Sequence, residues 1–298
     1  MYRYLAIVNP VAGAGRCGKL APNAISQLRD SGLVVDVVET KAPAEATHIA
    51  RQAYTEGRRH FIAVGGDGTA FEIVDGLFPQ AAAREPVRLG FLPMGTGNSF
   101  LRDFSDRGTE YAMESLIHGV GRTCDVVRLT HEHGTIHYIN VMTIGFGAEV
   151  GATTNRYFKP FGSAGYGLSV LINIVKLKSR EYPFRLDGGA VWRQPTVLTS
   201  FCNSRYTGGK MMMAPSADTS DGMIDLISVG KMGRVELLRN FPKIFAGTHI
   251  HHPLIKSARA KCIDFDISEE IDMVVDGEVL HHVPRQLTVL AGALEVGV

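Results

Sequence analysis

The strongest constraint on the fold is an alternation of short apolar runs and longer helical patterns, up to about residue 120. The apolar runs are rich in β-branched residues and nearly continuous, which is typical of strands covered on both faces. This alternation predicts a parallel sheet with helices on both sides, an α/β domain. The expected strands are 4–8, 34–40, 61–64 and 87–92, and the expected helices are about 19–31, 44–56, 69–77 and 109–119.

The pattern changes near Cys124, where strand-like runs begin to follow one another directly. Successive strands predict a mostly antiparallel second domain. The residues His131-Glu132-His133-Gly134 are typical of a hairpin turn. We expect domains at 1–124 and 125–298, and the final residues, about 289–298, are expected to pack back on the first domain. The expected strands are 126–130, 136–144, 197–202, 223–229, 260–267 and 271–275, and the expected helices are 164–178 and 234–241.

Composition excludes several classes of protein. The apolar fraction of 45% is ordinary for a folded chain, and the net charge of +1 gives no overall attraction to nucleic acid or to an acidic membrane. The four cysteines form no close pair, which is typical of a reducing compartment. No apolar run approaches the ~20 residues that a membrane-spanning helix needs. We expect a cytoplasmic protein with peripheral membrane contact and no nucleic-acid partner; the oligomeric state is open, with a homodimer among the options.

Three glycine-rich segments follow expected strands, at the sheet edge where ligands bind in such folds. The first begins Asn9-Pro10 and continues through Gly13 to Lys19. Its glycine spacing matches a dinucleotide fingerprint and most of a phosphate-binding Walker loop. However, Leu20 stands where a Walker loop needs a hydroxyl for Mg²⁺, and four residues separate the strand from the first glycine. Taken alone, this segment fits a flexible strand-to-helix turn equally well.

The second segment, Gly65-Gly66-Asp67-Gly68-Thr69, ends a buried strand and opens a helix. Glycines on both sides of one acid allow the backbone N–H groups to approach a phosphate closely. Thr69 is expected to cap the helix, whose positive end favours anions. Because a carboxylate repels phosphate, Asp67 is expected to act through Mg²⁺ or water; the alternative is that it supports the turn.

The third segment, 93–99, repeats the order of strand, glycine turn and helix start. Thr96 and Asn98 are expected to bond phosphate or ribose, with Gly95 in the turn. One such loop is common in α/β proteins. Three loops at one sheet edge favour a nucleotide-binding crevice.

Together, the three segments form a pattern that is specific to one protein family. Asn9-Pro10 with its glycines, the 65–69 segment and Pro93-Met94-Gly95-Thr96-Gly97-Asn98 occur in the same order in the diacylglycerol kinase catalytic-domain family, which the chain resembles over nearly its whole length. The resemblance implies a first domain like that of NAD kinases and phosphofructokinases, and a β-sandwich second domain. It also implies that ATP is bound by one set of positions, which are Asn9, Pro10, Gly13, Thr40, Gly66, Asp67, Gly68, Thr69, Glu72 and Thr96.

Two acidic clusters lie in the second half. Asp218 and Asp221 stand three apart before a glycine, so a tight loop can supply oxygen donors to Mg²⁺ or Ca²⁺, although an ordinary polar turn fits the spacing as well. The resemblance implies a structural Mg²⁺ held by these two aspartates and the carbonyl of Met223. In the second cluster, Asp276-Gly277-Glu278, the residues alone also fit a solvated hairpin tip. The resemblance implies that Asp276 is the catalytic base and that Glu278 lies near the nucleotide and its metal.

Two other patterns are weaker. His281 and His282 are adjacent on an expected strand and therefore point to opposite faces, so we expect surface or packing roles for the histidines and no shared metal ion. The aromatic residues near Tyr157, with Arg156 and Lys159, and the methionines 211–213 fit contact with acyl chains or core packing about equally.

The sequence therefore predicts an ATP- and Mg²⁺-dependent kinase that transfers the γ-phosphate to a hydroxyl of a diacylglycerol-like, sphingoid or ceramide lipid presented at a membrane surface. Asp276 and Asp67 are the expected catalytic residues. Two alternatives are an NAD or other small-molecule kinase with the same second loop, and a lipid-binding regulator without catalysis. The sequence does not select the acceptor lipid.

Overall fold

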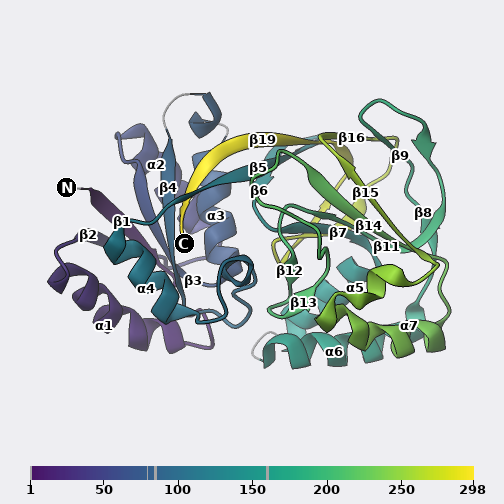
Figure 1. Cartoon of the computed structure of the whole chain (residues 1–298), viewed down its shortest axis with the longest axis horizontal. Coiled ribbons are helices and arrows are strands. Elements are labelled where there is room, and N and C mark those ends of the chain that lie inside the picture. Colours follow the sequence, from purple (N-terminus) through teal and green to yellow (C-terminus); the bar gives the residue numbers. More distant parts are fainter. Residues whose placement is uncertain (1, 79, 84–85, 159–160) are drawn as a thin grey trace. The chain divides into compact units, whose positions relative to one another are not determined.

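The computed structural model describes residues 2–78, 80–83, 86–158 and 161–298. The chain forms two compact units, which Figure 1 draws in sequence colours. The first comprises Met1–Asp125 and Gly292–Val298, and the second comprises Val126–Ala291. The chain therefore passes between the units twice. Among the described residues, no helix has the length and apolar character needed to cross a membrane.

A parallel sheet forms the centre of the first unit. Its strands are β1 (Arg3–Val8), β2 (Val34–Glu39), β3 (His60–Gly65), β4 (Val87–Pro93) and the end of β19 (Pro284–Gly297). They lie in the order β19-β4-β3-β1-β2, and each neighbouring pair is parallel. The central strands β3 and β4 are buried along almost their whole length, which explains their continuous apolar runs.

Helices cover both faces of this sheet. They are α1 (Arg16–Asp30), α2 (Glu45–Thr55), α3 (Asp67–Leu77) and α4 (Thr109–His118), with the short turns η1 (Gln80–Ala83) and η2 (Phe100–Asp103). Leu28 of α1 and Leu116 of α4 belong to one core layer with Val8 and Val64. α2 packs closely on α3. The predicted α/β domain is confirmed, although α3 begins at Asp67, so Thr69 lies inside the helix and does not cap it.

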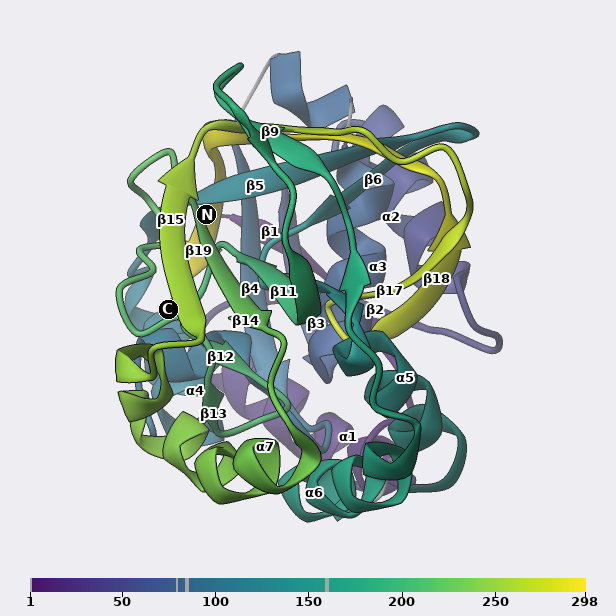
Figure 2. The same ribbon diagram turned by 90° about the vertical axis from the view of Figure 1, so that its right-hand side faces the viewer.

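The second unit contains two antiparallel layers (Figure 2). The first layer is built from β7 (Val141–Gly145), β8 (Arg180–Glu181), β11 (Pro195–Cys202), β14 (Ile224–Gly230), β15 (Ile255–Ala260), β17 (Ile271–Val275) and β18 (Glu278–His282). Its main path is β15-β14-β11-β7-β17-β18. The second layer contains β5 (Arg122–His131), β6 (Gly134–Tyr138), β9 (Phe184–Leu186), β10 (Val191–Trp192), β16 (Cys262–Phe265) and the first part of β19. The predicted antiparallel sandwich is confirmed.

Aromatic side chains join the two layers. Phe201 of β11 meets Phe265 of β16 edge to face, with ring centroids 5.4 Å apart, and meets Phe184 of β9 at 5.7 Å. Helices cover the other face of the first layer. They are α5 (Phe146–Thr153), the π turn η3 (Thr154–Phe158), α6 (Gly162–Asn173), η5 (Ile174–Lys176), α7 (Arg234–Asn240), η6 (Phe241–Ala246) and η7 (Thr248–His251), and a small hairpin of β12 (Tyr206–Thr207) and β13 (Met211–Met212) lies beside them.

Three predictions for this unit were wrong in detail. The expected strand 136–144 is two strands, β6 and β7, separated by Ile139 and Asn140. The expected strand 260–267 is divided between β15 and β16 because the chain changes layer near Lys261. α5 was not expected, although Gly145, with φ of 83°, ends β7 and directly precedes the helix.

Candidate active site

The three glycine-rich segments meet at the carboxyl ends of β1, β3 and β4. The Asn9 N–H donates to the Val64 carbonyl at 2.9 Å, which ties the first segment to the end of β3. The Met94 and Gly95 N–H groups donate to the Gly65 carbonyl at 2.7 and 2.8 Å, which ties the third segment to the second. The structure thus brings together the loops that the sequence predicted at one edge.

Close backbone approach explains the glycines at this edge. A Cβ on Gly95 would lie 2.8 Å from the Gly66 nitrogen and closer still to its Cα. Gly13 has φ of +60°, and a Cβ there would lie 2.5 Å from the Met94 carbonyl oxygen. The Arg16 guanidinium donates to the Gly95 carbonyl at 2.8 Å and adds a side-chain tie between the first and third segments. Any larger residue at Gly95 would force the loops apart, whereas a Cβ on Gly66 would lie 3.2 Å from the Gly95 Cα and need only a small shift.

Asp67 holds the third segment in place. Its carboxylate accepts hydrogen bonds from the N–H groups of Ser99 at 2.8 Å and Phe100 at 3.3 Å. Burial raises the pKa of Asp67 above its ordinary value, although the bonds from Ser99 and Phe100 act in the opposite direction. The structure therefore gives Asp67 a turn-supporting role, the alternative that the sequence left open, and leaves its phosphate-directed role a prediction.

The side chain of Asn98 carries an oxygen that is suited to a hydrogen bond from a ligand. It has φ of 50°, and its amide Nδ2 donates to the Gly95 carbonyl at 3.0 Å. Its Oδ1 is buried and has no hydrogen-bond partner among the described residues. Asn98 also lines a small hollow with Gly66 and Asp67. A hydroxyl or N–H donor from a bound molecule would satisfy this oxygen.

The other predicted nucleotide positions surround the same edge. Thr40 follows β2, and its N–H donates to the Val8 carbonyl at 2.8 Å. Pro10 accepts from the Gly18 N–H at 3.0 Å, and Thr96 is exposed in the third segment. Gly68 and Thr69 belong to the first turn of α3. These positions present backbone groups and small side chains, a composition that suits an anionic ligand.

Glu72 has a structural task in this unit. Its two carboxylate oxygens accept hydrogen bonds from the N–H groups of Ala44 at 3.0 Å and Ala46 at 3.1 Å, at the start of α2. The negative charge satisfies donors that a helix start leaves without partners. Glu72 therefore fixes the segment that follows Thr40, and its predicted contact with nucleotide stays a prediction.

In the second unit, Asp276 occupies the turn between β17 and β18. It has φ of 47°, and Gly277 has φ of +91°, the backbone of a tight hairpin turn. The buried carboxylate accepts from three consecutive N–H groups: Ile139 at 3.2 Å, Asn140 at 3.1 Å and Val141 at 2.8 Å. The break between β6 and β7 supplies these donors, because two of them lie outside either strand. The geometry fixes the orientation of the Asp276 carboxylate.

Sequence reasoning missed the polar residues beside this turn. Asn203 donates to the Ile139 carbonyl at 2.8 Å, and the Ser204 hydroxyl donates to the Asn140 side-chain oxygen. All three side chains are buried. The sequence did contain a signal. Asn140 lies within an apolar run that was expected to continue as a strand, and Asn203 follows a run that was expected to end as one. Glu278, the first residue of β18, lies opposite Val275 in the same hairpin.

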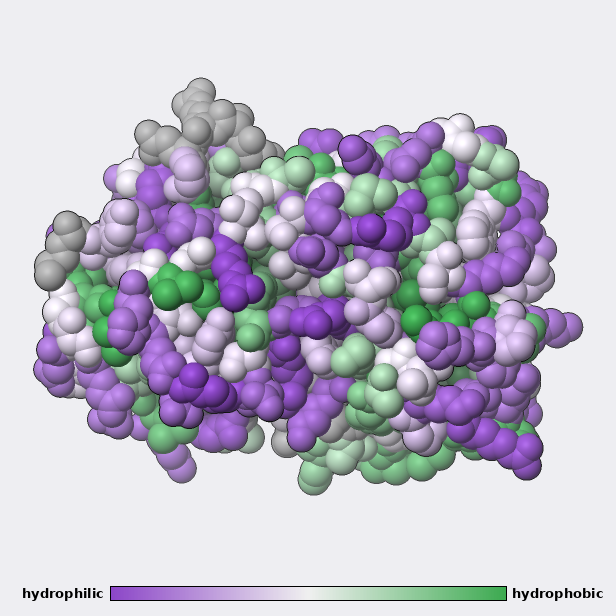
Figure 3. All heavy atoms as spheres, viewed as in Figure 1, coloured by the Kyte–Doolittle hydropathy of each residue, from purple (hydrophilic) through white to green (hydrophobic). Residues whose placement is uncertain are grey.

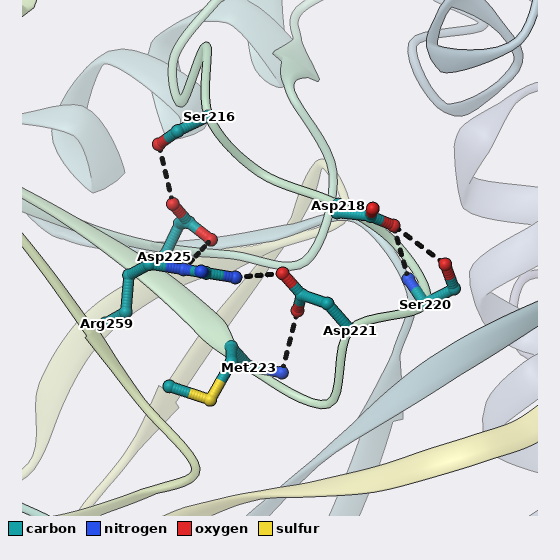
Figure 4. A network of polar contacts seen from close by, with 7 residues as sticks. All are labelled: Ser216, Asp218, Ser220, Asp221, Met223, Asp225 and Arg259. Carbon is teal, nitrogen blue, oxygen red and sulfur yellow. Dashed lines mark hydrogen bonds and ion pairs between the residues drawn. The ribbon is translucent and has the colours of Figure 1, made fainter.

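The loop before β14 holds the predicted metal ligands (Figure 4). The Asp218 carboxylate accepts from the Ser220 N–H at 2.9 Å, whereas Asp221 accepts from the Met223 N–H at 3.0 Å and pairs with Arg259. Figure 4 shows the two carboxylates turned toward these different partners. Arg259 also contacts buried Asp225 at 3.3 Å. Burial raises the pKa of Asp225, a hydrogen bond from Ser216 lowers it, and the charge of Asp218 raises it further.

An apolar cavity lies between the first layer and its helices. It encloses about 620 Å³ of space free of protein atoms, counting the part open to solvent. Leu198, Val229 and Ile255, adjacent across β11, β14 and β15, form its floor, and Phe146 and Val170 are among the residues of its wall. Its lining is apolar apart from Asn240 and His249, which suits a hydrocarbon chain.

The chain is similar to proteins of known families over nearly its whole length. Residues 3–129 match the family model described as the diacylglycerol kinase catalytic domain, and residues 140–298 match the YegS C-terminal NAD kinase beta sandwich-like domain. A diacylglycerol kinase of Mycobacterium tuberculosis is 30% identical over 98% of this chain and 93% of its own length. A diacylglycerol kinase of Bacillus subtilis is 27% identical over 93% of this chain and 90% of its own.

A solved structure is similar as well. A crystal structure of a Bacillus anthracis protein assigned as a diacylglycerol kinase superposes with a TM-score of 0.81 and 25% sequence identity. The superposition covers 99% of this chain and 94% of that one.

Proposed function

Since the chain belongs to the diacylglycerol kinase catalytic-domain family, with a YegS-type second domain, we propose that it transfers the γ-phosphate of ATP to a hydroxyl group of diacylglycerol. The first unit binds the nucleotide, and the second binds the lipid and accepts its proton. The features of each unit support one part of this reaction.

ATP is the proposed ligand of the three glycine segments. Their backbone N–H groups and the positive end of α3 suit phosphate oxygens, and the buried Oδ1 of Asn98 suits a hydroxyl donor such as ribose. We assign to Asp67 the task of keeping the second and third segments in register around the phosphates. Phosphoryl transfer depends mainly on such positioning and on charge neutralisation.

Asp276 is the proposed base for the lipid hydroxyl. Three N–H donors fix its carboxylate in one orientation, as a positioned base requires. In the step proposed, the hydroxyl oxygen forms a bond to the γ-phosphorus, the bond from phosphorus to the β–γ bridging oxygen breaks, and the proton passes to Asp276. A carboxylate suffices when the proton leaves late, after the new bond has begun to form.

The apolar cavity is the observation that carries the choice of a lipid acceptor. β7 begins at Val141, whose N–H binds Asp276, and ends at Gly145, which lies beside Leu198 on the cavity floor. These two ends of β7 are about 13 Å apart at the usual rise per strand residue. A hydroxyl at Asp276 and an acyl chain in the cavity can therefore belong to one molecule. NAD or a small sugar would leave the cavity unused.

A stripe on α6 supports contact with a membrane surface. Leu168, Leu171 and Ile172 are about half exposed, and Val175 in the following turn is 68% exposed. Their spacing of three and four residues places them along one side of the helix. Figure 3 shows apolar residues gathered at the edge of the second unit where Figure 1 draws α6. Tyr157 and Phe161 nearby are also exposed, whereas Met211 and Met213 are core residues; Lys159 lies outside the described residues.

Mg²⁺ is the proposed cation, both with ATP and at the loop before β14. Two carboxylates and one carbonyl are the hard oxygen donors that Mg²⁺ takes, so Asp218, Asp221 and Met223 fit the ion in kind. Arg259 already pairs with Asp221, so a cation there competes with that guanidinium. The ion would neutralise charge in this loop and fix its conformation.

An acceptor panel tests the proposed function. Radioactive γ-labelled ATP is offered with diacylglycerol, monoacylglycerol, sphingosine, ceramide or NAD, and the products are separated by mobility. The proposal predicts phosphorylated diacylglycerol as the major product. Labelled NAD as the major product, or no labelled product from any acceptor, would support the small-molecule kinase or the regulator in its place.

A further inference from the structure

A cluster of histidines and glutamates lies where the turn between β5 and β6 meets the end of β18. His131 ends β5, Glu132 and His133 form the turn, and His282 ends β18. The ring of His131 stacks on that of His282, with centroids 4.0 Å apart and planes 26° apart. The fold thus brings together residues from opposite ends of the second unit's sequence.

Nitrogen atoms of three histidines lie near the two oxygens of the Glu132 carboxylate. Glu132 Oε1 lies 3.7 Å from His282 Nδ1 and 3.6 Å from His133 Nε2. Glu132 Oε2 lies 4.0 Å from His131 Nδ1 and accepts from the Val283 N–H at 2.6 Å. The hydrogen bond from the Val283 N–H fixes the carboxylate through Oε2 and leaves Oε1 available to another partner.

Two of these atoms lack partners. Glu132 Oε1 and His282 Nδ1 are both buried and make no hydrogen bond among the described residues. Their separation of 3.7 Å exceeds hydrogen-bond length, so proton sharing does not account for them. Leaving two such groups without partners costs free energy, and a cation between them would satisfy both.

The spacing suits a tetrahedral transition-metal ion. In such a site, ligand bonds of about 2.0–2.1 Å place neighbouring donor atoms about 3.3 Å apart, close to the 3.7 Å between Glu132 Oε1 and His282 Nδ1. One donor atom from each of His131, Glu132 and His282 falls within 4.8 Å of the others. Imidazole and carboxylate donors favour Zn²⁺ over Mg²⁺ or Ca²⁺.

The neighbouring histidine on β18 has partners of its own. His281 has separate partners, Asp272 at 2.9 Å and Glu270 at 3.3 Å. That His281 and His282 share no ion stays a prediction.

We propose that His131, Glu132 and His282 form a zinc-binding site, which fastens the end of β18 to the turn between β5 and β6. β18 is one strand of the hairpin whose tip carries Asp276. The ion therefore stabilises the base of that hairpin. The expectation from sequence that the histidines have only surface or packing roles is replaced for this cluster.

Zinc titration of the full chain tests the site. Untagged protein is stripped with a chelator, dialysed, and titrated with ZnCl₂ against a chromophoric zinc chelator, while thermal unfolding is followed in parallel. The proposal predicts one ion per chain and a higher Tm with zinc. His282→Ala and Glu132→Gln should each weaken binding at least about tenfold and remove the Tm shift. His281→Ala, the neighbour with other partners, should bind like the wild type.

Glu132→Gln is expected to fold like the wild type, because the amide keeps an oxygen that can accept from the Val283 N–H. No saturable zinc binding by the wild type would overturn the site. Equal binding by the wild type, His282→Ala and Glu132→Gln would overturn it as well, since the ion would then lie elsewhere.

Discussion

The Asp276 carboxylate accepts a 2.8 Å hydrogen bond from the N–H of Val141, the first residue of β7, although the two residues lie 135 positions apart. The same strand leads from Asp276 to the apolar cavity. A polar group that is suited to a hydroxyl and a cavity that is suited to an acyl chain are thus linked by one rigid element. The following predictions test this arrangement and the loops of the first unit.

Asp67→Asn should change the pH dependence of Tm and lower the kinase rate. Because the pKa of Asp67 is raised in the folded state, the wild type loses stability as the pH rises from the ordinary value of 3.8 through the raised value. The variant has no such ionisation, so its Tm relative to the wild type should increase as the pH rises above about 4. Its kinase rate should fall about 10²-fold, because Ser99 and Phe100 lose their charged partner. A pH-independent Tm difference would contradict the burial argument.

Asp218→Asn should abolish stabilisation by Mg²⁺. The wild type should show a Tm that rises with millimolar Mg²⁺, since an ion that binds only the folded state stabilises it. Asp218 is exposed, so the substitution itself should change Tm little. Asp266→Asn removes another exposed carboxylate of the same unit and is the control. If Mg²⁺ raises the Tm of Asp218→Asn as much as that of the wild type, this loop does not bind the ion.

Val229→Phe should discriminate between lipid chains. Val229 is buried on the cavity floor beside Leu198, and a phenyl ring there occupies space proposed for acyl carbons. The KM for long-chain diacylglycerol should rise about tenfold, with a smaller change for a short-chain analogue and none for ATP. Val37→Phe, at a half-exposed position of β2, is the matched control. Equal effects on both chain lengths would show that the cavity does not hold the chain.

Leu171→Asp should weaken binding to vesicles. Leu171 is 54% exposed in the middle of the apolar stripe of α6, and membrane contact would bury it. A charge there should lower the bound fraction in a flotation assay with diacylglycerol-containing vesicles, by about tenfold in partition coefficient. Val37→Asp introduces the same charge at an exposed apolar position of the first unit and should leave flotation unchanged. Unaltered flotation of Leu171→Asp would exclude α6 as the contact.

The first unit was predictable because its signals are local. Each of β1, β3 and β4 is an apolar run followed by a glycine segment, and parallel strands bring their carboxyl ends to one edge. The contact between Gly66 and Gly95 follows from this arrangement. The role of Glu72 did not, because its partners Ala44 and Ala46 are backbone donors that no pattern in the sequence marks.

The second unit was less predictable because its key contacts are distant in sequence. Residues 136–144 were expected to form one strand, and the distant Asp276 carboxylate explains why Ile139 and Asn140 leave it. The histidine cluster was missed for the same reason, because His131 and His282 are distant in sequence and come from different layers. Spacing arguments, which consider near neighbours such as His281 and His282, cannot detect such a cluster.

The central claim is that Asp276 accepts the proton of the lipid hydroxyl, and Asp276→Asn tests it most directly. Asparagine keeps one oxygen for the Asn140 and Val141 N–H groups but turns its NH₂ toward the Ile139 N–H, so Tm should fall modestly. The KM for ATP should change little. At saturating ATP and diacylglycerol, the account predicts that kcat falls by about 10²–10⁴-fold. A kcat within a few-fold of the wild type would contradict it.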